Sequence, residues 1–482
     1  MLWTHFTSGK NKFSRREPPG PFGLPVLGYM PFLGSEAHVT FIKLARTYGN
    51  IFQVQLGLQK VVVLSSIDII KEAFGKDVFA GRPHSASFQI FLNNSSSSFS
   101  FRTGNAQWKF LRKVAMKALG MFASSRNSRL EAVVDEAADE LFAELAAFEG
   151  HPSNPQRSIF DCAASVIGRI VFGLDFSSKD GALKSILSMN QKFANFFAVG
   201  SVLDSLPFGS WIMGSSVRDF VESIKPVEEF MKKHIIEHVK YCEEENDVRD
   251  VADAIALVAQ QTPADLKGQL GLTDDRIRCS ARDLFGAGFT TVMESIRWAI
   301  NLLAVFPEVQ RRAREELDQV CGDRPVRLTD RSNIPYNEAV LLEVFRFSSF
   351  VALSLPHSTM EDTTLRGYFI PKGTTVFSNL YAHHNDSQFF PEPDSFKPCR
   401  FLTIDGKLDS DAAQLVIPFG VGKRRCVGEN LARQELSLLI GRLLQKFEIH
   451  QDPANPVNIR DAMPGLTRGA IQVPLIFKRI AV

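Results

Sequence analysis

The stretch "FGVGKRRCVG", residues 419–428, places a single cysteine among glycines and basic residues. Beyond Cys426 apolar residues recur at helical spacing, so the cysteine is expected at or just before the N-terminus of a helix. The helix dipole and the neighbouring Arg424 and Arg425 favour the ionised thiol and predict a lowered pKa. The residues that define this helix are Leu431, Ala432, Leu436, Leu439, Leu443 and Phe447.

The other residues of this loop suit a flat, bulky ligand. Gly420, Gly422 and Gly428 let the backbone turn tightly and approach such a ligand closely. Phe419 is expected to shield the sulfur of Cys426 from water. A thiolate held in this way is either a nucleophile or an iron ligand, whereas a structural or redox cysteine would predict no correlated features elsewhere in the chain.

The composition of the chain argues against several classes of protein. A net charge of +2 over 482 residues gives no global field that would favour nucleic acid as a partner. The six cysteines lie far apart and form no C-x-x-C pair, so neither a disulfide framework nor a zinc site is supported, and a reducing compartment is expected. The 40 phenylalanines against 6 tyrosines indicate a Phe-rich core or a Phe-lined pocket.

The N-terminal region has the pattern of a membrane-proximal segment. Residues 1–17 carry a basic cluster, and the Pro/Gly-rich run "EPPGPFGLPVLG" (17–28) follows. Such a pair often flanks the cytosolic end of a membrane anchor, but no stretch reaches the ~18 consecutive apolar residues of a spanning helix. We expect residues 1–17 to be either the remnant of an anchor or a disordered basic tail, and residues 18–482 to form a single catalytic domain.

Hydrophobic periodicity predicts a mainly α fold with a minor β region. Apolar residues alternate with glutamines from 52 to 56, and Val61–Leu64 follows a break at Gly57, which predicts a β-hairpin over 51–66. Residues 103–350 are mainly helical in pattern, and one helix is expected to begin at Pro307 and to end before Gly322. Short strands are expected within 363–371 and 374–381.

A long helical run over residues 273–306 contains two interior glycines, Gly286 and Gly288, each of which costs about 1 kcal/mol relative to alanine. Thr291 is placed to hydrogen-bond the carbonyl oxygen of Ala287 and to open the helix locally. The glycines therefore indicate either backbone exposed to a small ligand or a close contact with a second helix.

The pattern Phe-x-x-Gly-x-Arg-x-Cys-x-Gly at 419–428 resembles the haem-ligand loop of the cytochrome P-450 superfamily, and further landmarks of that family follow in order from about residue 18 to about residue 478. The resemblance implies the cytochrome P-450 fold, with haem b between a long central helix and the helix after the cysteine loop. It makes Cys426 the axial ligand of the haem iron, with Phe419, Gly420 and Arg424 as further cofactor-binding residues.

Further motifs carry the same resemblance. The segment "AQWKFLRKVAMKAL" supplies Trp108 and Arg112, and "LSLPHST" supplies His357, at positions that contact haem propionates in the family. The family also has a buried ionic network with a structural role, and Glu343, Arg346 and Arg400 match its positions.

The resemblance assigns catalysis to Gly288 and Thr291 of the central helix, where dioxygen and its protons are handled. The residue before this threonine is usually Asp or Glu in the family, and here it is Thr290, so proton delivery would rely on water or on Glu294. Family analogy gives the substrate pocket a roof around residues 99–101 and a lining of Phe285, Ala287, Phe289, Val351 and Leu353.

The implied activity is that of a haem-thiolate monooxygenase, which inserts one oxygen atom of O2 into a lipophilic substrate with electrons from NADPH passed through a flavoprotein reductase. The likeness is closest to the animal microsomal branch that oxidises drugs, planar aromatics and steroids, in the motifs "DLFGAGFTT", "SSFVALSLPHST" and "FGVGKRRCVGE". A haem-thiolate isomerase or dehydratase and a non-enzymatic haem sensor stay open as alternatives.

Partners and location follow from the same resemblance. The segment 192–211 is expected either to dip into a bilayer or to form a buried helix. The implied location is the cytosolic face of the endoplasmic reticulum membrane, with a peripheral or soluble protein as the alternative because no anchor is recognised in this chain. The reductase is expected to dock on a basic face formed by Lys109, Lys113, Lys117, Lys423 and Arg425. The alternative is that these charges are merely solvated.

Overall fold

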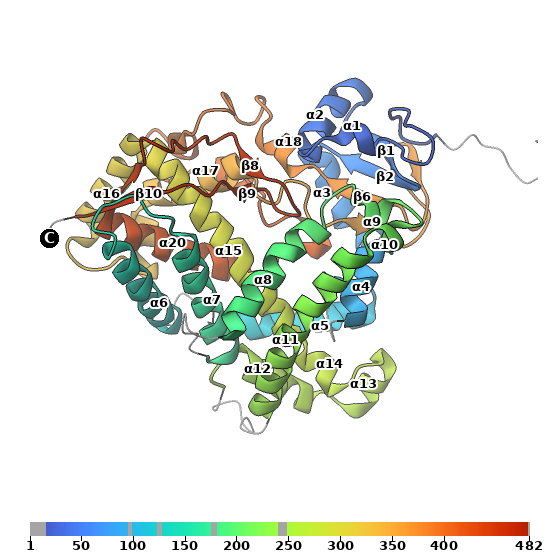
Figure 1. Cartoon of the computed structure of the whole chain (residues 1–482), viewed down its shortest axis with the longest axis horizontal. Helices are drawn as coiled ribbons and strands as arrows, with labels where there is room; N and C mark the ends of the chain where they lie inside the picture. The colour runs from blue at the N-terminus through green and yellow to red at the C-terminus, as the bar shows by residue number, and fades with distance from the viewer. Residues whose placement is uncertain (1–15, 95–98, 123–127, 175–180, 240–247, 481–482) are drawn as a thin grey trace, which may run out of the picture.

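The computed structural model describes residues 16–94, 99–122, 128–174, 181–239 and 248–480. Almost all of the predicted basic tail, residues 1–15, lies outside these ranges, as does Cys242. Helices fill most of the molecule, with α15 crossing its centre, and the strands β1, β2 and β6 lie together beside α1 and α2 (Figure 1).

In the described residues of the N-terminal half, the named elements are helices and one hairpin. Its helices are α1 (Met30–Leu33), α2 (Ala37–Tyr48), α3 (Ile67–Gly75), α4 (Ala86–Asn94), α5 (Ala106–Phe122), α6 (Ser128–Ala146), α7 (Gln156–Phe172), α8 (Gly181–Phe196), α9 (Val202–Ser205), α10 (Gly209–Ile212) and α11 (Gly214–Val239), with the 3₁₀ turn η1 (Asp77–Phe79).

The second half begins with helices and ends with short strands. Its helices are α12 (Val251–Gln261), α13 (Ala264–Leu270), α14 (Asp274–Arg278), α15 (Ser280–Val305), α16 (Pro307–Cys321), α17 (Pro335–Ser348), α18 (Leu380–His384), α19 (Ser410–Gln414) and α20 (Glu429–Lys446), with the 3₁₀ turns η3 (Leu328–Asn333), η4 (Pro398–Phe401) and η5 (Gly422–Arg424).

The largest sheet contains the predicted hairpin. Its strand order is β1 (Ile51–Leu56), β2 (Gln59–Leu64), β6 (Thr375–Ser378) and β3 (His357–Ser358), with β2 and β6 parallel and the other pairs antiparallel. In β2, Val61 and Val63 face the apolar cluster around Phe41 of α2, whereas Val62 and Leu64 face the cluster that includes α3. Because side chains alternate along a strand, a strand covered on both faces reads as a continuous apolar run.

The remaining strands form short antiparallel pairs. These pairs are β4 (Thr363–Leu365) with β5 (Tyr368–Ile370), β7 (Phe447–Gln451) with β10 (Leu475–Arg479), and β8 (Ala462–Met463) with β9 (Gly469–Ala470).

The main core lies between α5, α6, α7, α15, α16, α17 and α20. Helix α16 begins at Pro307 and ends before Gly322, as its sequence predicts, and buries Val309, Ala313 and Leu317 on one face. The mainly α fold with a minor β region is therefore confirmed.

The helical run predicted over 273–306 is interrupted, whereas the strand expected within 374–381 is present as β6. The helical run 273–306 is two helices, because α14 ends at Arg278 and α15 begins at Ser280, with Cys279 between them. The strand predicted within 374–381 ends at Ser378, because the Asn379 side chain accepts a hydrogen bond from the backbone N–H of Ala382 and caps α18.

Candidate functional site

The loop around Cys426 is fixed from both sides. The backbone N–H of Cys426 donates to the carbonyl oxygen of Phe419 at 2.9 Å. Gly422 has a φ of +74°, and a Cβ there would lie 2.0 Å from the carbonyl oxygen of Phe74 at the end of α3, so only glycine fits. At Gly420 (φ +69°) nothing lies within 4 Å of the Cβ position. The loop is thus packed on α3 at one point and open at another, which suits a flat ligand.

The pKa of the Cys426 thiol is raised, and the prediction that the loop lowers it is wrong. Protein surrounds the sulfur closely although part of the side chain is exposed, and this desolvation is the largest effect. The backbone N–H of Gly428 and the charges of Arg112 and Arg425 act in the opposite direction without overcoming it. A thiol in this position ionises when a metal ion binds it, because coordination itself displaces the proton.

Phe419 lies beside α17 and α20 at the start of the loop. Its ring meets Phe345 of α17 edge-on at 5.4 Å between centroids, and the guanidinium of Arg433 lies 4.9 Å from its centroid. These contacts fix the ring against the helix that carries the ionic network described below.

Arg424 and Arg112 converge on Trp108 of α5. The Arg424 guanidinium lies 4.1 Å from the Trp108 ring centroid and donates to the carbonyl oxygens of Ala80 and Phe99. Arg112 lies 5.9 Å from the same ring and donates to the carbonyl oxygen of Arg425. The predicted residues of α5 and of the cysteine loop are therefore brought together.

Arg82 joins these two arginines, although no sequence motif predicts a role for it. Its guanidinium donates to the carbonyl oxygens of Ser100, at 3.0 Å, and Pro356, at 2.8 Å. It precedes Arg424 by 342 positions, so its neighbours are set by the tertiary fold. The local signal is weak, since Arg82 is only one arginine between Gly81 and Pro83 in a predicted loop.

The three arginines form a cluster of uncompensated positive charge. Burial and mutual repulsion lower the pKa of Arg424 to about 8 and that of Arg82 to about 10. Over the described ranges, Arg82, Arg112 and Arg424 donate only to backbone carbonyl oxygens and form no ion pair with a carboxylate. Such a cluster calls for an anionic ligand.

His357 lies within the influence of this cluster. Its ring stacks on Phe74 at 3.7 Å, and its Nδ1 lies 2.8 Å from the carbonyl oxygen of Phe79. Burial and repulsion by Arg82 and Arg424 hold the pKa of His357 well below its usual value. The ring is therefore neutral, and its Nε2 becomes a donor only if an anion stabilises a second proton.

The centre of α15 is open on one face. Gly286 and Ala287 are exposed although residues on either side are buried, and nothing lies within 4 Å of a Cβ at Gly286. The hydroxyl of Thr291 donates to the carbonyl oxygen of Ala287 at 2.9 Å, as predicted from its position. This face presents backbone and one hydroxyl group to the space beside the helix.

Gly288 and the two phenylalanines face the other way. A Cβ at Gly288 would lie 2.6 Å from the side chain of Ile167 in α7, so this glycine is explained by helix packing. Phe285 and Phe289 are each 1% exposed and pack on Phe172 and Phe160 of α7 at 5.8 and 5.7 Å. They lie half a helical turn from Ala287 and belong to the core, which corrects their expected place in a pocket lining.

Glu294 is not available as the missing acid. Its carboxylate pairs with Arg297 at 2.5 Å and accepts the backbone N–H of Ala470 at 3.0 Å. Thr290, which stands where an acid is usual, instead donates to the Oδ1 of Asn190 in α8 at 2.9 Å.

Glu343, Arg346 and Arg400 are in contact behind the cysteine loop. The Arg346 guanidinium donates two hydrogen bonds to the Glu343 carboxylate, at 2.7 and 2.8 Å, and Arg400 donates one to the same carboxylate at 3.2 Å. Glu343 and Arg346 are fully buried, and Arg346 also donates to the carbonyl oxygen of His384. The contacts tie α17 to the η4 segment and to α18.

The expected substrate-lining residues after α17 lie in the core. Leu353 is buried in the apolar cluster of the sheet, and Val351 is partly buried against the main core. A set of phenylalanines instead gathers around Phe101, in the segment predicted as a roof, and neighbouring rings in this set have centroids 4.1–6.4 Å apart. This Phe cluster comprises Phe88 and Phe91 of α4, Phe101, Phe193 and Phe196 of α8, Phe197, and Phe220 of α11.

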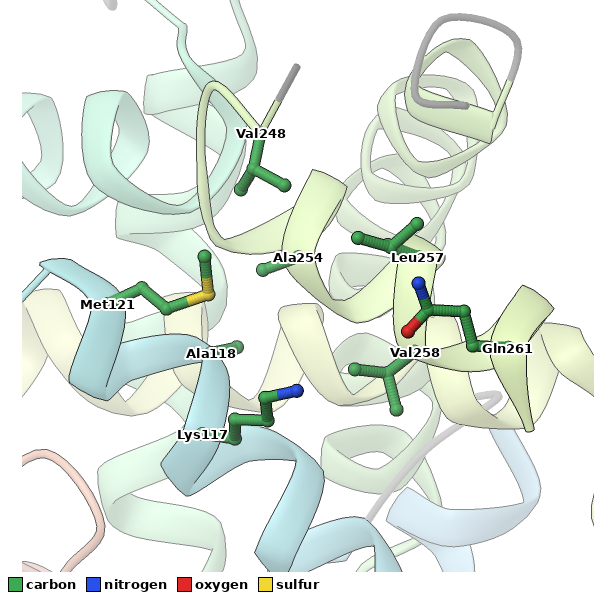
Figure 2. Close-up of a pocket in the computed structure, with 8 residues that line it drawn as sticks. All are labelled: Lys117, Ala118, Met121, Val248, Ala254, Leu257, Val258 and Gln261. Atoms are coloured by element: carbon green, nitrogen blue, oxygen red, sulfur yellow. The ribbon is translucent and has the colours of Figure 1, made fainter. Parts of the chain in front are cut away.

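A separate small pocket lies between α5 and α12 (Figure 2). Lys117, Ala118 and Met121 line it from α5, and residues of α12 close the opposite side. None of the residues of the cysteine loop or of the arginine cluster takes part in it.

The open face of α15 and the surroundings of Cys426 fit haem. A cysteine that ionises on binding a metal stands near three arginines that call for an anion, and haem meets both requirements with its iron and its two propionates. These features define the class of haem-thiolate proteins. A family model for Cytochrome P450 matches residues 18–476, and the chain belongs to the cytochrome P450 family. It is a cytochrome P450 monooxygenase whose cofactor is haem b.

The chain is similar over most of its length to animal cytochromes P450. Cytochrome P450 1A1 of Rattus norvegicus is 38% identical over 464 residues, which cover 94% of this chain and 88% of the relative. Cytochrome P450 1A1 of Homo sapiens is 38% identical over 445 residues, covering 90% and 86%. That of Mesocricetus auratus is 38% identical over 456 residues, covering 92% and 86%.

Proposed function

We propose that this cytochrome P450 takes electrons from NADPH through a flavoprotein reductase and inserts one oxygen atom of O2 into a flat, lipophilic substrate such as a planar aromatic, a drug-like molecule or a steroid. The observation that carries the substrate class is the Phe cluster around Phe101, built from α4, α8 and α11. Phenylalanine rings at a binding site favour flat apolar ligands through stacking and edge-to-face contacts. The relatives named Cytochrome P450 1A1 support the same class.

The proposed roles follow the geometry. Cys426 holds the iron, and Arg424, Arg112, Trp108 and His357 hold the propionates with Arg82. When bound, haem supplies the iron at which dioxygen is activated and from which one oxygen atom is transferred. Phe419 and Gly420 let the cofactor lie close to the loop.

Thr291 is proposed to pass on the two protons that the reaction consumes for each oxygen molecule. Its hydroxyl is kept in place by the carbonyl oxygen of Ala287 and lies on the open face of α15. Because Glu294 is paired with Arg297, these protons reach Thr291 from solvent. Gly288 contributes by allowing α15 to approach α7.

The reductase is proposed to dock on the basic face near the cysteine loop. Lys109, Lys113 and Lys117 are exposed along α5. Lys109 and Lys423 both form ion pairs with the Asp77 carboxylate, at 2.7 and 3.5 Å. Lys113 and Lys117 form no ion pair with any described residue. Unpaired cations on one surface attract an acidic partner and accelerate its association.

The membrane surface is proposed to contact an exposed apolar patch. Trp211 of α10 is 85% exposed, and Phe208, directly before α10, is 61% exposed. Leu58 of the β1–β2 turn is 59% exposed, and its backbone N–H donates to the carbonyl oxygen of Ser205 beside them. Among the described helices none is long and apolar enough to cross a bilayer. We propose that this apolar patch contacts the cytosolic face of the endoplasmic reticulum membrane.

The deciding experiment combines a spectrum with turnover. The reduced, carbon monoxide-bound protein is expected to show the strongly red-shifted Soret band of thiolate-ligated haem. Product from a planar aromatic test substrate is expected only with NADPH and reductase. A red-shifted band without product would favour a haem sensor, and product from a peroxide without reductase would favour an isomerase or dehydratase.

The docking face is tested by charge reversal. The double variant Lys113→Glu/Lys117→Glu is expected to raise the KM for reductase about tenfold at low salt, because two attractive charges become repulsive, and to lose much of the salt dependence. Lys232→Glu, at an exposed position on α11, is the control. Equal effects of the two variants would contradict a local docking site.

A further inference from the structure

Two adjacent buried histidines of α18 hold the backbone just ahead of the cysteine loop, and the proposed function uses neither of them. His383 and His384 are 1% and 0% exposed. Nε2 of His383 lies 2.8 Å from the carbonyl oxygen of Leu415, and Nε2 of His384 accepts the backbone N–H of Ile417 at 3.1 Å. Because a carbonyl oxygen only accepts and a backbone N–H only donates, His383 carries its ring proton on Nε2 and His384 carries it on Nδ1.

The other side of the His384 ring is bonded to the end of α17. Its Nδ1–H donates to Oγ of Ser349 at 2.6 Å, and that hydroxyl donates to the carbonyl oxygen of Arg346 at 3.0 Å. Arg346 in turn donates from its guanidinium to the carbonyl oxygen of His384 at 2.9 Å. Burial is the largest effect that holds the pKa of His384 well below its usual value, so the ring stays neutral. His384 is therefore joined to Arg346 through both its ring and its backbone.

The position of Ile417 is passed on to Cys426 through two short hydrogen-bonded turns. The carbonyl oxygen of Ile417 accepts the backbone N–H of Gly420 at 3.1 Å, and the carbonyl oxygen of Phe419 accepts that of Cys426 at 2.9 Å. Around Gly420 the loop is open, since nothing lies within 4 Å of its Cβ position. A displacement of Ile417 would therefore move the cysteine.

We infer that His384 is a positioning residue that couples the Glu343–Arg346 ion pair to the cysteine loop and thereby keeps the sulfur of Cys426 on the haem iron. Groups behind a metal ligand hold its orientation, and losing them weakens the bond to the metal. A neutral imidazole suits this place because one of its nitrogens accepts a hydrogen bond while the other donates one. The inference rests on the proposed function, in which Cys426 holds the iron.

The test separates the two hydrogen bonds of the His384 ring. In His384→Gln the side-chain oxygen reaches the position of Nε2 and can still accept from Ile417, whereas in His384→Asn the amide reaches only the position of Nδ1 and can still donate to Ser349. The measurement is the rate at which the red-shifted carbon monoxide band of the full-length, haem-loaded protein converts to the unshifted band. We expect this conversion to be about ten- to hundredfold faster in His384→Asn than in the wild type, because the sulfur leaves the iron more readily when the loop can move. His384→Gln is expected to stay near the wild-type rate.

The matched control is Gln310→Leu. The buried side chain of Gln310 in α16 holds the backbone N–H and the carbonyl oxygen of Ile449 in β7, a segment outside the cysteine loop. This variant is expected to unfold at a lower temperature, measured by circular dichroism, and to keep the wild-type conversion rate. General loss of stability is thereby distinguished from loss of position.

The inference is overturned if His384→Asn converts no faster than the wild type or no faster than Gln310→Leu. Should His384→Asn fail to fold, Ser349→Ala takes its place, because it removes the far end of the same chain of hydrogen bonds; it is expected to speed the conversion, and an unchanged rate overturns the inference. The wild-type spectrum separates this failure from that of the proposed function. A normal red-shifted band with equal rates refutes only the role of His384, whereas a missing band refutes the haem-thiolate site itself and the inference with it.

Discussion

At Cys426 two opposing effects act on one sulfur atom. Positive charge from Arg112 and Arg425 favours the thiolate, and desolvation by the surrounding protein favours the thiol more strongly. The loop thus keeps the cysteine protonated until a metal takes the place of the proton. Nucleophilic chemistry by this cysteine, one of the two possibilities that the sequence leaves open, is disfavoured for the same reason.

Removing the sulfur is expected to remove the haem signature without unfolding the chain. Cys426→Ala deletes the iron ligand but leaves the Gly422 contact with α3 intact. We expect the red-shifted carbon monoxide band to disappear while the far-ultraviolet circular dichroism keeps most of its helical signal. A variant that retains the band would show that another residue ligates the iron.

A second residue-scale prediction concerns Glu435 of α20. It is 2% exposed, has no hydrogen-bond partner in the described part of the chain, and burial raises its pKa to about 8 from the usual 4.5. Between these two pH values the folded state holds a proton that the unfolded state has released, so the stability of the protein falls as the pH rises through this window. Cys162 of α7, whose pKa is also raised by burial, lies close enough to be influenced by it.

Glu435→Gln is expected to remove this pH dependence. The variant carries no ionisable group, so it should unfold at nearly the same temperature at pH 5 and pH 8, and at pH 8 it should be the more stable protein by on the order of a few kcal/mol. Thermal unfolding at the two pH values provides the measurement. Glu229→Gln, at an exposed site on α11, should leave the wild-type slope in place, and an unchanged slope in Glu435→Gln would argue against a buried neutral carboxyl.

At the scale of elements, α15 separates two functions on its two faces. One face, with Gly288, Phe285 and Phe289, is packed on α7, and the other, with Gly286 and Ala287, is open. The two glycines of one motif therefore exist for different reasons, one for close helix packing and one on the side that faces the ligand.

Alanine substitutions distinguish these two glycines. Gly288→Ala is expected to lower the stability by about 1–3 kcal/mol, because its Cβ overlaps the side chain of Ile167. Gly286→Ala, where the Cβ meets nothing, should raise the stability by about 1 kcal/mol through helix propensity. Chemical denaturation of both variants measures the difference. The double variant Gly288→Ala/Ile167→Ala should show strong non-additivity, and simple addition of the two effects would rule out this contact.

The elements that the sequence predicts best are those with a local cause. The β1–β2 hairpin follows from alternation, α16 from its proline and glycine ends, and the cysteine loop from its glycines. What depends on distant neighbours was not predictable. The place of Arg82 depends on Pro356, 274 residues away. The burial of Phe285 and Phe289 depends on α7, and the pKa of Cys426 depends on the density of protein around it.

At the scale of the whole molecule, segments from both ends of the N-terminal half meet at one surface. The β1–β2 turn contacts α9 so closely that a Cβ at Gly57 would lie 1.8 Å from the carbonyl oxygen of Ser205. In Figure 1 these elements lie together with α1 and α10. The same α9 contributes Asp204, whose carboxylate accepts from the backbone and hydroxyl of Ser87 at the start of α4. The apolar patch and the Phe cluster are therefore joined through one short helix.

The patch is expected to govern binding to lipid. Phe208→Ser/Trp211→Ser should lower the affinity for phosphatidylcholine vesicles by tenfold or more, since each large apolar side chain contributes roughly 1.5–3 kcal/mol when it leaves water completely. Vesicle co-sedimentation measures this loss. Ile404→Ser removes a fully exposed apolar side chain from a different loop and should leave binding unchanged, so equal losses would point to non-specific adsorption.

The arginine cluster also links the cofactor to the lifetime of the protein. Arg82, Arg112 and Arg424 repel one another in the folded chain, and a ligand that carries two carboxylates converts this repulsion into attraction. A ligand that binds only the folded state shifts the folding equilibrium in proportion to the logarithm of its concentration. Newly made chains that meet no haem will therefore open more often and be degraded sooner. The amount of this protein in a cell should accordingly follow the local supply of haem as well as the rate of its synthesis.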